Sequence, residues 1–437
     1  MSMREPCFLT AAEAARLIRE GNLTCEALVR SCLDRIAARD SVIKAWLHVD
    51  PAHALAQARE IDKRPPAGPM HGLAFGVKDV IDTHDLPTTQ NSPLYQGHRP
   101  AKDAACVGVV RHSGAVILGK TDTVEFAGGG RKAATRNPHN LAHTPGGTSS
   151  GSAAAVADFQ VHYAFGTQTS GSHIRPASFN GIYGMKPTWG VVSREGVKQL
   201  SVMLDTVGWY GRSAEDLAMV AEAFRLPGLS GSKPSTVKGL RVGLCQTPRW
   251  SKIEPGGEKA LKAAVERLEK AGAVIEELRL PETFAGLYDA QDIILQGEAG
   301  AAFLPDYLAS QDRLHAEFRD KVENKTGVTP KAMAEAYDLA GACRPAFDRI
   351  AANFDAVLTP SAPGEAPEGL GWTGDWVFNV IWTLLHVPCI AIPCTVGPKG
   401  LPVGIQIVGP RFGDGQLLRV AAAVAPAIDA EGRSRTP

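Results

Sequence analysis

"PGGTSSGSAAAVADFQVHYAFGTQTSGSHIRPASFNGIYGMKP", residues 145–187, alternates turns rich in glycine and serine with short apolar segments. The small residues at 150–157 predict a closely packed helix, and HYAFGTQT at 162–169 predicts a buried strand that enters a glycine turn. Three hydroxyl residues in a row, 148–150, lie between the glycines that open the stretch. The stretch therefore predicts an α/β fold whose loops carry the functional residues.

Strands and helices alternate in the same way along most of the chain. Apolar strands are expected within 73–82, continuing past Lys78, at the end of 103–121, at 241–245, and in FDAVLTPSAPG, PCIAIPC and PVGIQIVGP near the C-terminus. Helices are expected after the capping residues Thr10 and Thr24, at 212–224, over most of 258–340 and near 414–426. No repeat or low-complexity linker divides the chain. We therefore expect one large α/β domain over residues 1–437, its sheet covered by helices on both faces.

The composition is typical of a folded protein with no special affinity for polyanions. Of 437 residues, 44% are hydrophobic and 21% charged, which argues against disorder. Lys and Arg total 46, as do Asp and Glu, so a net charge of zero gives no reason to expect nucleic acid or an anionic membrane as a partner.

The N-terminal sequence and the cysteines indicate the cellular compartment in which the protein is expected. MSMREPCFLTAAEAARLIREG lacks the apolar run of a signal peptide, and no segment approaches the about eighteen apolar residues of a membrane span. The eight cysteines include no C-x-x-C pair, and neither H-E-x-x-H nor clustered carboxylates suggest a metal. We expect a reduced cytoplasmic protein that needs no metal and does not bind a membrane.

GAVILGKT, residues 114–121, satisfies the P-loop pattern G-x-x-x-x-G-K-[ST]. A P-loop follows a strand and opens a helix, so that its N–H groups face phosphate. Here the order is reversed, because a helix precedes Gly114 and AVIL predicts a buried strand. EKAGAVIEE, residues 269–277, has the same order of helix, glycine and strand. We interpret both glycines as helix C-terminal caps, and we expect no nucleotide site.

GTSSG, residues 147–151, matches the nucleophile elbow G-x-S-x-G of the α/β-hydrolases, with Ser149 as the nucleophile. An elbow needs a strand directly before it, whereas NLAHTPGG contains proline and two glycines. Of the twelve histidines, context distinguishes only His173, and it directly follows Ser172, where a base-to-nucleophile geometry is rare. We therefore do not expect Ser149 to be the nucleophile.

Several blocks of the sequence strongly resemble the amidase signature enzymes. They are 145–187, GVKDVIDT (76–83), LDTVGWYGRSAEDLAMV (204–220), LTPSAP (358–363) and GLPVGIQIVGPRFGDGQLLRVAAA (400–423). The blocks lie in the family's order and span most of the chain. The resemblance implies the amidase signature fold, with a central mixed β-sheet, a core motif region over 70–220 and a helix-rich, substrate-shaping segment over 258–345. GTQT…S…IRPAS looks closest to the malonamidase-like branch.

The resemblance also implies a Ser–hydroxyl–Lys triad that works without a cofactor. Lys78 in GVKD matches the family's lysine, and Ser172 at the end of TSGS matches the nucleophile. Thr148 holds the place of the bridging hydroxyl in a cis peptide, where the family normally has serine. The backbone N–H groups of the turn Thr169-Ser170-Gly171-Ser172 resemble the oxyanion hole.

These residue types suit acyl transfer. A serine hydroxyl is a poor nucleophile unless a base takes its proton, and lysine is a base only when burial keeps it neutral. The apolar neighbours in FGVKDVI favour that burial of Lys78. In the implied mechanism Thr148 passes the proton from Ser172 to Lys78 and later returns it to the leaving amine, and water then hydrolyses the acyl-enzyme.

Three positions leave alternatives open. Thr148 keeps the hydroxyl but adds a methyl group, and Ser170 stands where the family mostly has glycine, so it is strained if that position needs a positive φ. Arg175 matches an arginine that resembles a clamp for a substrate carboxylate in the malonamidase-like branch. An arginine that pairs with a buried acid or with carbonyls fits the sequence equally well.

Two further stretches have simpler interpretations. Asp205 in LDTVG is interpreted as a structural turn residue. The aromatic stretch 371–382, GWTGDWVFNVIW, either lines a pocket or packs in the core.

The sequence thus favours an amidase that hydrolyses the carbon–nitrogen bond of a small, linear amide. A carbamate (urethane) hydrolase would use the same site. The glutaminase subunit of a transamidation complex would need a protein partner, and its family usually has aspartate where this chain has Gln168. A non-catalytic scaffold would result if Thr148 breaks the relay. Homodimers are frequent in the family, so a homodimer is one expected state.

Overall fold

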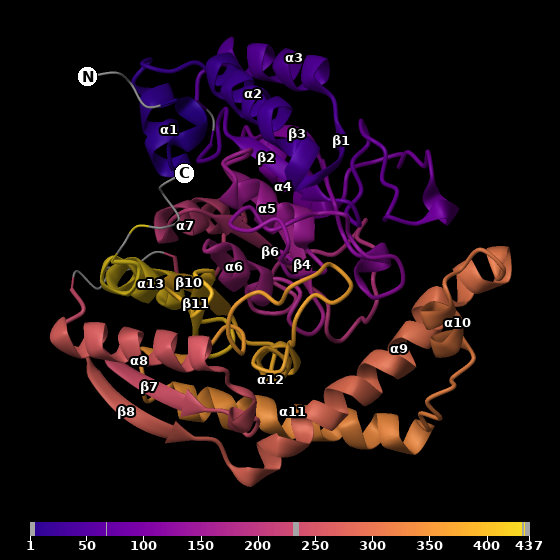
Figure 1. Ribbon diagram of the computed structural model, residues 1–437, viewed down its shortest axis with the longest axis vertical. Coiled ribbons are helices and arrows are strands. Elements are labelled where there is room, and N and C mark those ends of the chain that lie inside the picture. The colour runs from indigo at the N-terminus through magenta and orange to yellow at the C-terminus, as the bar shows by residue number, and fades with distance from the viewer. Residues whose placement is uncertain (1–4, 67, 230–235, 431, 433–437) are drawn as a thin grey trace.

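One mixed β-sheet runs through the molecule (Figure 1). The computed structural model describes residues 5–66, 68–229, 236–430 and 432, and within them eleven strands lie in the order β1-β3-β2-β4-β6-β5-β10-β11-β9-β7-β8. In chain order the strands are β1 (Trp46–Val49), β2 (Ala74–Lys78), β3 (Val116–Thr121), β4 (Tyr163–Gln168), β5 (Tyr183–Lys186), β6 (Thr206–Gly211), β7 (Arg241–Gln246), β8 (Val274–Arg279), β9 (Ala356–Pro360), β10 (Cys389–Val396) and β11 (Pro402–Val408). Parallel pairs such as β2–β4 and antiparallel pairs such as β4–β6 occur in the same sheet, which confirms the predicted fold class.

Helices cover both faces of the sheet, as the sequence predicts. Successive residues of a strand point to opposite faces, and along β10 Ile390 and Ile392 join one hydrophobic cluster while Cys389 and Ala391 join the other. The first cluster is covered mainly by α1 (Ala11–Arg19), α4 (Ala105–His112), α7 (Ala214–Ala223), α8 (Pro255–Lys270) and α13 (Asp414–Ile428). The second is covered mainly by α2 (Cys25–Ile43), α3 (Pro51–Asp62), α5 (Ser150–Ala157), α6 (Ile174–Asn180), α9 (Leu287–Ser310), α11 (Pro330–Ala351) and α12 (Val380–Leu384).

The helices α9 and α11 lie side by side, and α10 (Ala316–Val322) packs against α9 (Figure 1). We call these three helices the helical arm. A third cluster fixes the helical arm to the central loops, since Phe303 of α9 and Phe318 of α10 both pack against Phe126. These helices make most of segment 258–345 helical, and β8 is its one strand among the described residues.

The two helix–glycine–strand patterns fold as predicted. The helix α4 ends at His112, Gly114 takes a φ of +91°, and β3 follows; α8 ends at Lys270, Gly272 takes a φ of +92°, and β8 follows. Only glycine adopts such a φ without a penalty. The residues that match a P-loop therefore form a buried strand, and their N–H groups belong to the sheet.

The prediction that the strand continues past Lys78 is wrong. The strand β2 ends at Lys78, and the chain turns through an Ile81 N–H bond to the Lys78 carbonyl at 3.0 Å. Asp79 holds this turn, because its carboxylate pairs with Lys120 at 3.1 Å and accepts the N–H of Thr89 at 2.9 Å. The turn places Lys78 at the very end of its strand.

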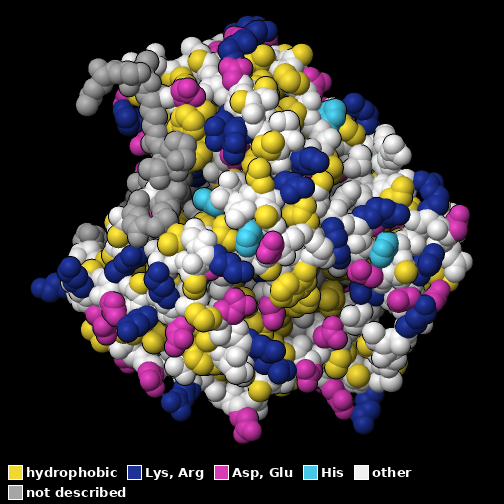
Figure 2. All heavy atoms as spheres, in the orientation of Figure 1, with side chains coloured by type: hydrophobic (Ala, Val, Ile, Leu, Met, Phe, Trp, Pro, Cys, Tyr) yellow, Lys and Arg dark blue, Asp and Glu magenta, His cyan; other side chains and the backbone are white. Residues whose placement is uncertain are grey.

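The surface carries charges of both signs. Figure 2 shows Lys and Arg interspersed with Asp and Glu over the visible face. Among the described residues, no helix is long and apolar enough to cross a membrane. All eight cysteines are buried free thiols.

The packing of α5 on the sheet leads to a stability prediction. A Cβ at Gly151 would overlap the carbonyl oxygen of Ala45 and the backbone nitrogen of Asp122. Gly151→Ala is therefore expected to destabilise the protein by about 1–3 kcal/mol and to lower its thermal midpoint. The matched control is Gly108→Ala in α4, where no atom lies within 4 Å of the new Cβ, and a gain of about 0.5–1 kcal/mol is expected. Equal midpoints for the two variants would contradict this close approach.

Candidate active site

A cavity of about 200 Å³ opens where β4 ends and the chain turns into α6. Its lining includes Thr148, the turn Thr169–Ser172 and Arg175. The structure thus brings into one cavity every predicted site residue except Lys78, which lies directly beneath it.

The sheet explains why Lys78 lies there. The strands β2 and β4 are parallel neighbours, with Gly76 opposite Ala164, so both strands reach the same edge of the sheet at their carboxyl ends. Lys78 is the last residue of β2, and its Nζ lies 2.6 Å from Thr167 Oγ1 on β4.

The amine of Lys78 is fully buried among hydroxyl groups. Besides Thr167, Nζ lies 2.8 Å from Thr148 Oγ1 and 3.0 Å from Ser149 Oγ. Burial lowers the pKa of Lys78 well below its ordinary value, and the negative charge of Asp205 opposes that shift only in part. The neutral amine, which can accept a proton, is therefore favoured.

Thr148 and Ser149 use their hydroxyls differently. Ser149 is fully buried, and its hydroxyl donates to the Thr167 carbonyl oxygen at 3.2 Å while accepting the Thr167 N–H. Thr148 is half-buried and faces the cavity, and the peptide bond that precedes it, Gly147–Thr148, is cis. Of the two, Thr148 is thus the hydroxyl that contacts both Lys78 and the cavity.

Ser172 opens into the cavity with 9% of its surface exposed. Its hydroxyl makes no hydrogen bond within the described ranges, and the backbone N–H groups of Ser170, Gly171 and Ser172 likewise donate to no acceptor there. Ser170 is not among the residues with positive φ, so the backbone strain considered for it does not occur. The turn therefore presents free N–H donors beside a free hydroxyl, an arrangement suited to an oxyanion.

Arg175 is 1% exposed and binds mainly backbone carbonyls. Nη2 donates to the Gly147 carbonyl oxygen at 2.5 Å and to Thr373 Oγ1 at 3.0 Å, and Nε donates to the Thr373 carbonyl oxygen at 2.8 Å. The ring of Trp376 lies 5.6 Å from the guanidinium, and burial lowers the pKa of Arg175 to about 10. Its Nη1 is buried and has no acceptor among the described atoms. Arg175 thus ties the peptide before Thr148 to the loop 371–376.

The cavity walls come from elements that carry no motif. Leu295 of α9 and Leu200 form an apolar side, and Glu317 of α10 and Lys132 face each other at 3.9 Å on the lining. Sequence reasoning missed all four, because no local pattern marks a residue that reaches the site from a distant helix or loop.

The aromatic stretch 371–382 serves both purposes that the sequence left open. Trp372 and Trp376 line the cavity and are 55% and 43% exposed, whereas Trp382 is buried in the core.

Asp205 and His173 make contacts that stabilise the loops around the cavity and the core. The Asp205 carboxylate accepts from Thr169 Oγ1 at 2.6 Å and from the Leu200 N–H at 2.7 Å, which agrees with its interpretation as a turn residue. The ring of His173 stacks on Tyr210 at 3.9 Å and is fully buried, and burial lowers its pKa to about 3.

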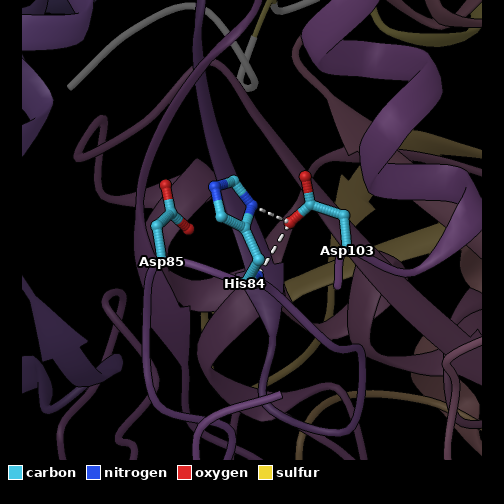
Figure 3. Close-up of side chains that lie close together, drawn as sticks. All are labelled: His84, Asp85 and Asp103. Carbon is cyan, nitrogen blue, oxygen red and sulfur yellow. Dashed lines mark hydrogen bonds and ion pairs between the residues drawn. The ribbon is translucent and has the colours of Figure 1, made fainter. Parts of the chain in front are cut away.

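In the described part of the chain, one group could hold a metal ion by its geometry: His84, Asp85 and Asp103 (Figure 3). Arg111 already pairs with both aspartates, at 2.6 Å from Asp85 and 3.0 Å from Asp103. None of the three residues lines the cavity. We interpret the group as an ion-pair network.

Comparisons with known proteins agree with this geometry. Residues 27–418 match the family model Amidase. A glutamyl-tRNA(Gln) amidotransferase subunit of Symbiobacterium thermophilum is 33% identical over 470 aligned residues, which cover 95% of this chain and 96% of the relative.

Two solved structures share the fold over nearly the whole chain. The peptide amidase from Stenotrophomonas maltophilia is 28% identical, with a TM-score of 0.81 and 96% of each chain covered. A protein from a vestigial complex that reveals the origins of an s-triazine catabolic enzyme is 26% identical, with a TM-score of 0.85, covering 95% of this chain and 98% of that one. The chain therefore belongs to the amidase family, that of the amidase signature enzymes, which act on carbon–nitrogen amide bonds.

Proposed function

We propose that this protein hydrolyses a small linear amide through an acyl-enzyme, with Ser172 as nucleophile, Thr148 as proton relay and Lys78 as base. The observation that carries the proposal is the fully buried amine of Lys78 at 2.8 Å from the Thr148 hydroxyl, below the cavity that Ser172 lines. A buried lysine with no carboxylate in hydrogen-bond contact is the arrangement in which the amine is neutral and basic.

Proton counting supports Thr148 as the relay. A neutral amine offers two N–H donors and one lone pair, so one of its three hydroxyl neighbours must donate to it. The hydrogen of Ser149 goes to the Thr167 carbonyl, which leaves Thr148 and Thr167 as donors. Of these two, only Thr148 is half-exposed at the cavity beside Ser172.

The reaction then follows in balanced steps. Ser172 gives its proton to the Thr148 oxygen as Thr148 gives its own to Lys78, and the serine oxygen attacks the substrate carbonyl. The negative oxygen of the tetrahedral intermediate accepts hydrogen bonds from the turn Thr169–Ser172. The proton returns from Lys78 through Thr148 to the leaving amine, and water releases the acid by the same route. No metal or cofactor takes part.

The substrate side of the proposal rests on the cavity lining. We propose that segment 258–345 shapes the pocket through Leu295 and Glu317. The positive charge of Arg175 on the cavity lining favours a substrate carboxylate, although its Nε and Nη2 already bind carbonyls. The likeness to the malonamidase-like branch stays a prediction, as does a homodimer.

One other function has specific support. The similarity to a glutamyl-tRNA(Gln) amidotransferase subunit favours a glutaminase role, in which the chain would hydrolyse an amide at this same site and would copurify with partner chains. The Lys78–Thr148 contact weighs against the scaffold alternative, because the threonine keeps its hydroxyl on the amine. Carbamate hydrolysis would use the same residues, and turnover of matched amide and carbamate substrates distinguishes the two.

We predict that a fluorophosphonate labels Ser172 and that Lys78→Met slows the labelling by about 10²–10⁴-fold, the usual contribution of a general base. The wild-type rate should rise with pH through the lowered pKa of Lys78, because only the neutral amine accepts a proton. Peptide mass spectrometry identifies the site. Lys186→Met removes another fully buried lysine and controls for lost stability. Labelling at Ser149 would contradict the assignment of Ser172 as the nucleophile.

Thr148→Ser is expected to retain or raise activity, because it keeps the relay hydroxyl and removes the methyl group. Thr148→Val keeps the shape without the hydroxyl and should lower kcat by about 10²-fold or more. Ser150→Ala is the matched control, since this neighbouring hydroxyl donates to the Gly146 carbonyl and does not contact Lys78. Full activity of the valine variant in a steady-state amide assay would remove Thr148 from the mechanism.

Arg175→Ala is expected to raise KM more for a carboxylate-bearing amide than for its neutral analogue, because it removes a buried positive charge from the cavity lining. Both substrates should also lose kcat, since the Gly147 carbonyl is released. Steady-state kinetics on the pair measures the difference. Equal losses on both substrates would show that Arg175 only holds the backbone.

A further inference from the structure

We propose that Gln291 of α9 and Thr383 of α12 are positioning residues that aim the oxyanion donors of the turn Thr169–Ser172. The inference rests on the proposed function and concerns residues outside the triad and outside the turn. Neither residue lies in a motif, and neither is among the residues that line the cavity.

Every carbonyl that precedes a free N–H in this turn is tied down. The Thr169 carbonyl oxygen accepts from Gln291 Nε2 at 3.3 Å, and the Ser170 carbonyl oxygen accepts from Thr383 Oγ1 at 2.9 Å. The Gly171 carbonyl oxygen accepts the backbone N–H of Arg175 at 3.2 Å. Three peptide units in a row are therefore held at their oxygen ends.

Holding the oxygen of a peptide unit also fixes its N–H. The unit is planar, and in a trans unit the C=O and the N–H point in opposite directions. In the described ranges only Gly147–Thr148 is cis, so the turn is trans. Gln291 thus sets the direction of the Ser170 N–H, and Thr383 sets that of the Gly171 N–H. Both N–H groups are among the free donors of the turn.

The serine at position 170 strengthens the hold. Its Oγ accepts from the same Gln291 Nε2 at 2.8 Å, a shorter bond than the one to the Thr169 carbonyl. Gln291 is 3% exposed, so its amide is committed to these partners. A glycine at position 170 has no oxygen to offer there. The serine that departs from the family's glycine therefore has a defined task, which is to anchor the turn to α9.

A second residue of α9 holds the loop behind the turn. Glu298, two helical turns after Gln291 and on the same side, accepts the Met203 N–H at 2.9 Å and the hydroxyl of Ser201. This loop carries Asp205, which accepts from Thr169 Oγ1 at 2.6 Å. One face of α9 therefore supports the turn directly through Gln291 and indirectly through Glu298.

Thr383 is part of a second hydrogen-bond network that holds the turn Thr169–Ser172, and this one involves Gln168. Gln168 Nε2 donates to Thr383 Oγ1 at 3.0 Å, while Gln168 Oε1 accepts the N–H groups of His173 at 3.1 Å and Ile174 at 3.0 Å. The residue before the turn thus binds the residues after it and also orients the hydroxyl that holds the Ser170 carbonyl.

The test compares Gln291→Leu with the matched control Gln296→Leu, five residues further along α9, whose amide reaches Asp292 and Lys321 instead of the turn. We expect Gln291→Leu and Thr383→Val each to lower kcat and the rate of fluorophosphonate labelling at Ser172 by about 10-fold or more, with KM changed less than 3-fold. Gln296→Leu should stay within about 2-fold of the wild type.

Gln291→Glu keeps the size of the side chain and guards against a variant that fails to fold. An ionised carboxylate cannot donate to the Thr169 carbonyl, whereas a protonated one can, so the activity relative to wild type should rise as the pH falls. A ratio that does not change with pH, or a kcat for Gln291→Leu and Thr383→Val equal to that of Gln296→Leu, overturns the proposal. A wild-type protein that is not labelled at Ser172 overturns the proposed function itself, and this inference with it.

Discussion

The rest of the site depends on one buried amine. Lys78 lies at the end of a central strand, out of contact with water, and its three side-chain neighbours in hydrogen-bond contact are hydroxyls. A cation there would need a partner charge, because hydroxyl dipoles compensate only part of the lost hydration. The negative charge of Asp205 raises the pKa of Lys78 in part, but the two side chains form no ion pair in the described chain. Burial favours the neutral amine, and a neutral amine needs one hydroxyl as donor and two as acceptors, so the three neighbouring hydroxyls cannot all play the same part.

Close packing of two helices on the sheet delivers the other groups to that amine. The helix α5 begins just after Ser149, and α6 begins just after His173. A Cβ at Gly166 of β4 would come within 2.9 Å of Ser149 Oγ and would collide with the His173 ring, so only glycine lets both segments approach this strand. The chain before each helix therefore arrives above the sheet at the place where β2 and β4 end. Thr148 and Ser172, 24 residues apart in the sequence, meet there for that reason.

The sequence predicts the parts of this arrangement that have local causes. The glycine caps at 114 and 272 follow from short patterns of helix and strand, and the candidate residues of the site come from the resemblance of local motifs to the amidase signature enzymes. The strand expected beyond Lys78 does not form, because the Asp79–Lys120 ion pair stabilises a turn there. The β-propensity of Val80 and Ile81 gives no sign of this turn. The parts played by α9 could not be predicted, because each is a contact across 95 or more residues of chain, and no sequence spacing marks such a contact.

The placement of α9 has a consequence for selectivity. Leu295 on the cavity wall and Gln291 behind the turn Thr169–Ser172 are four residues apart, which is one turn of the same helix. On the proposed function, a substrate that shifted the wall at Leu295 would also act on the anchor of the turn at Gln291, because both residues lie on one turn of α9. Binding and donor alignment are then not independent. On the proposed function, a substrate of the wrong shape would lose stabilisation of its transition state as well as contacts in the ground state, and its kcat would fall as well as its KM rise.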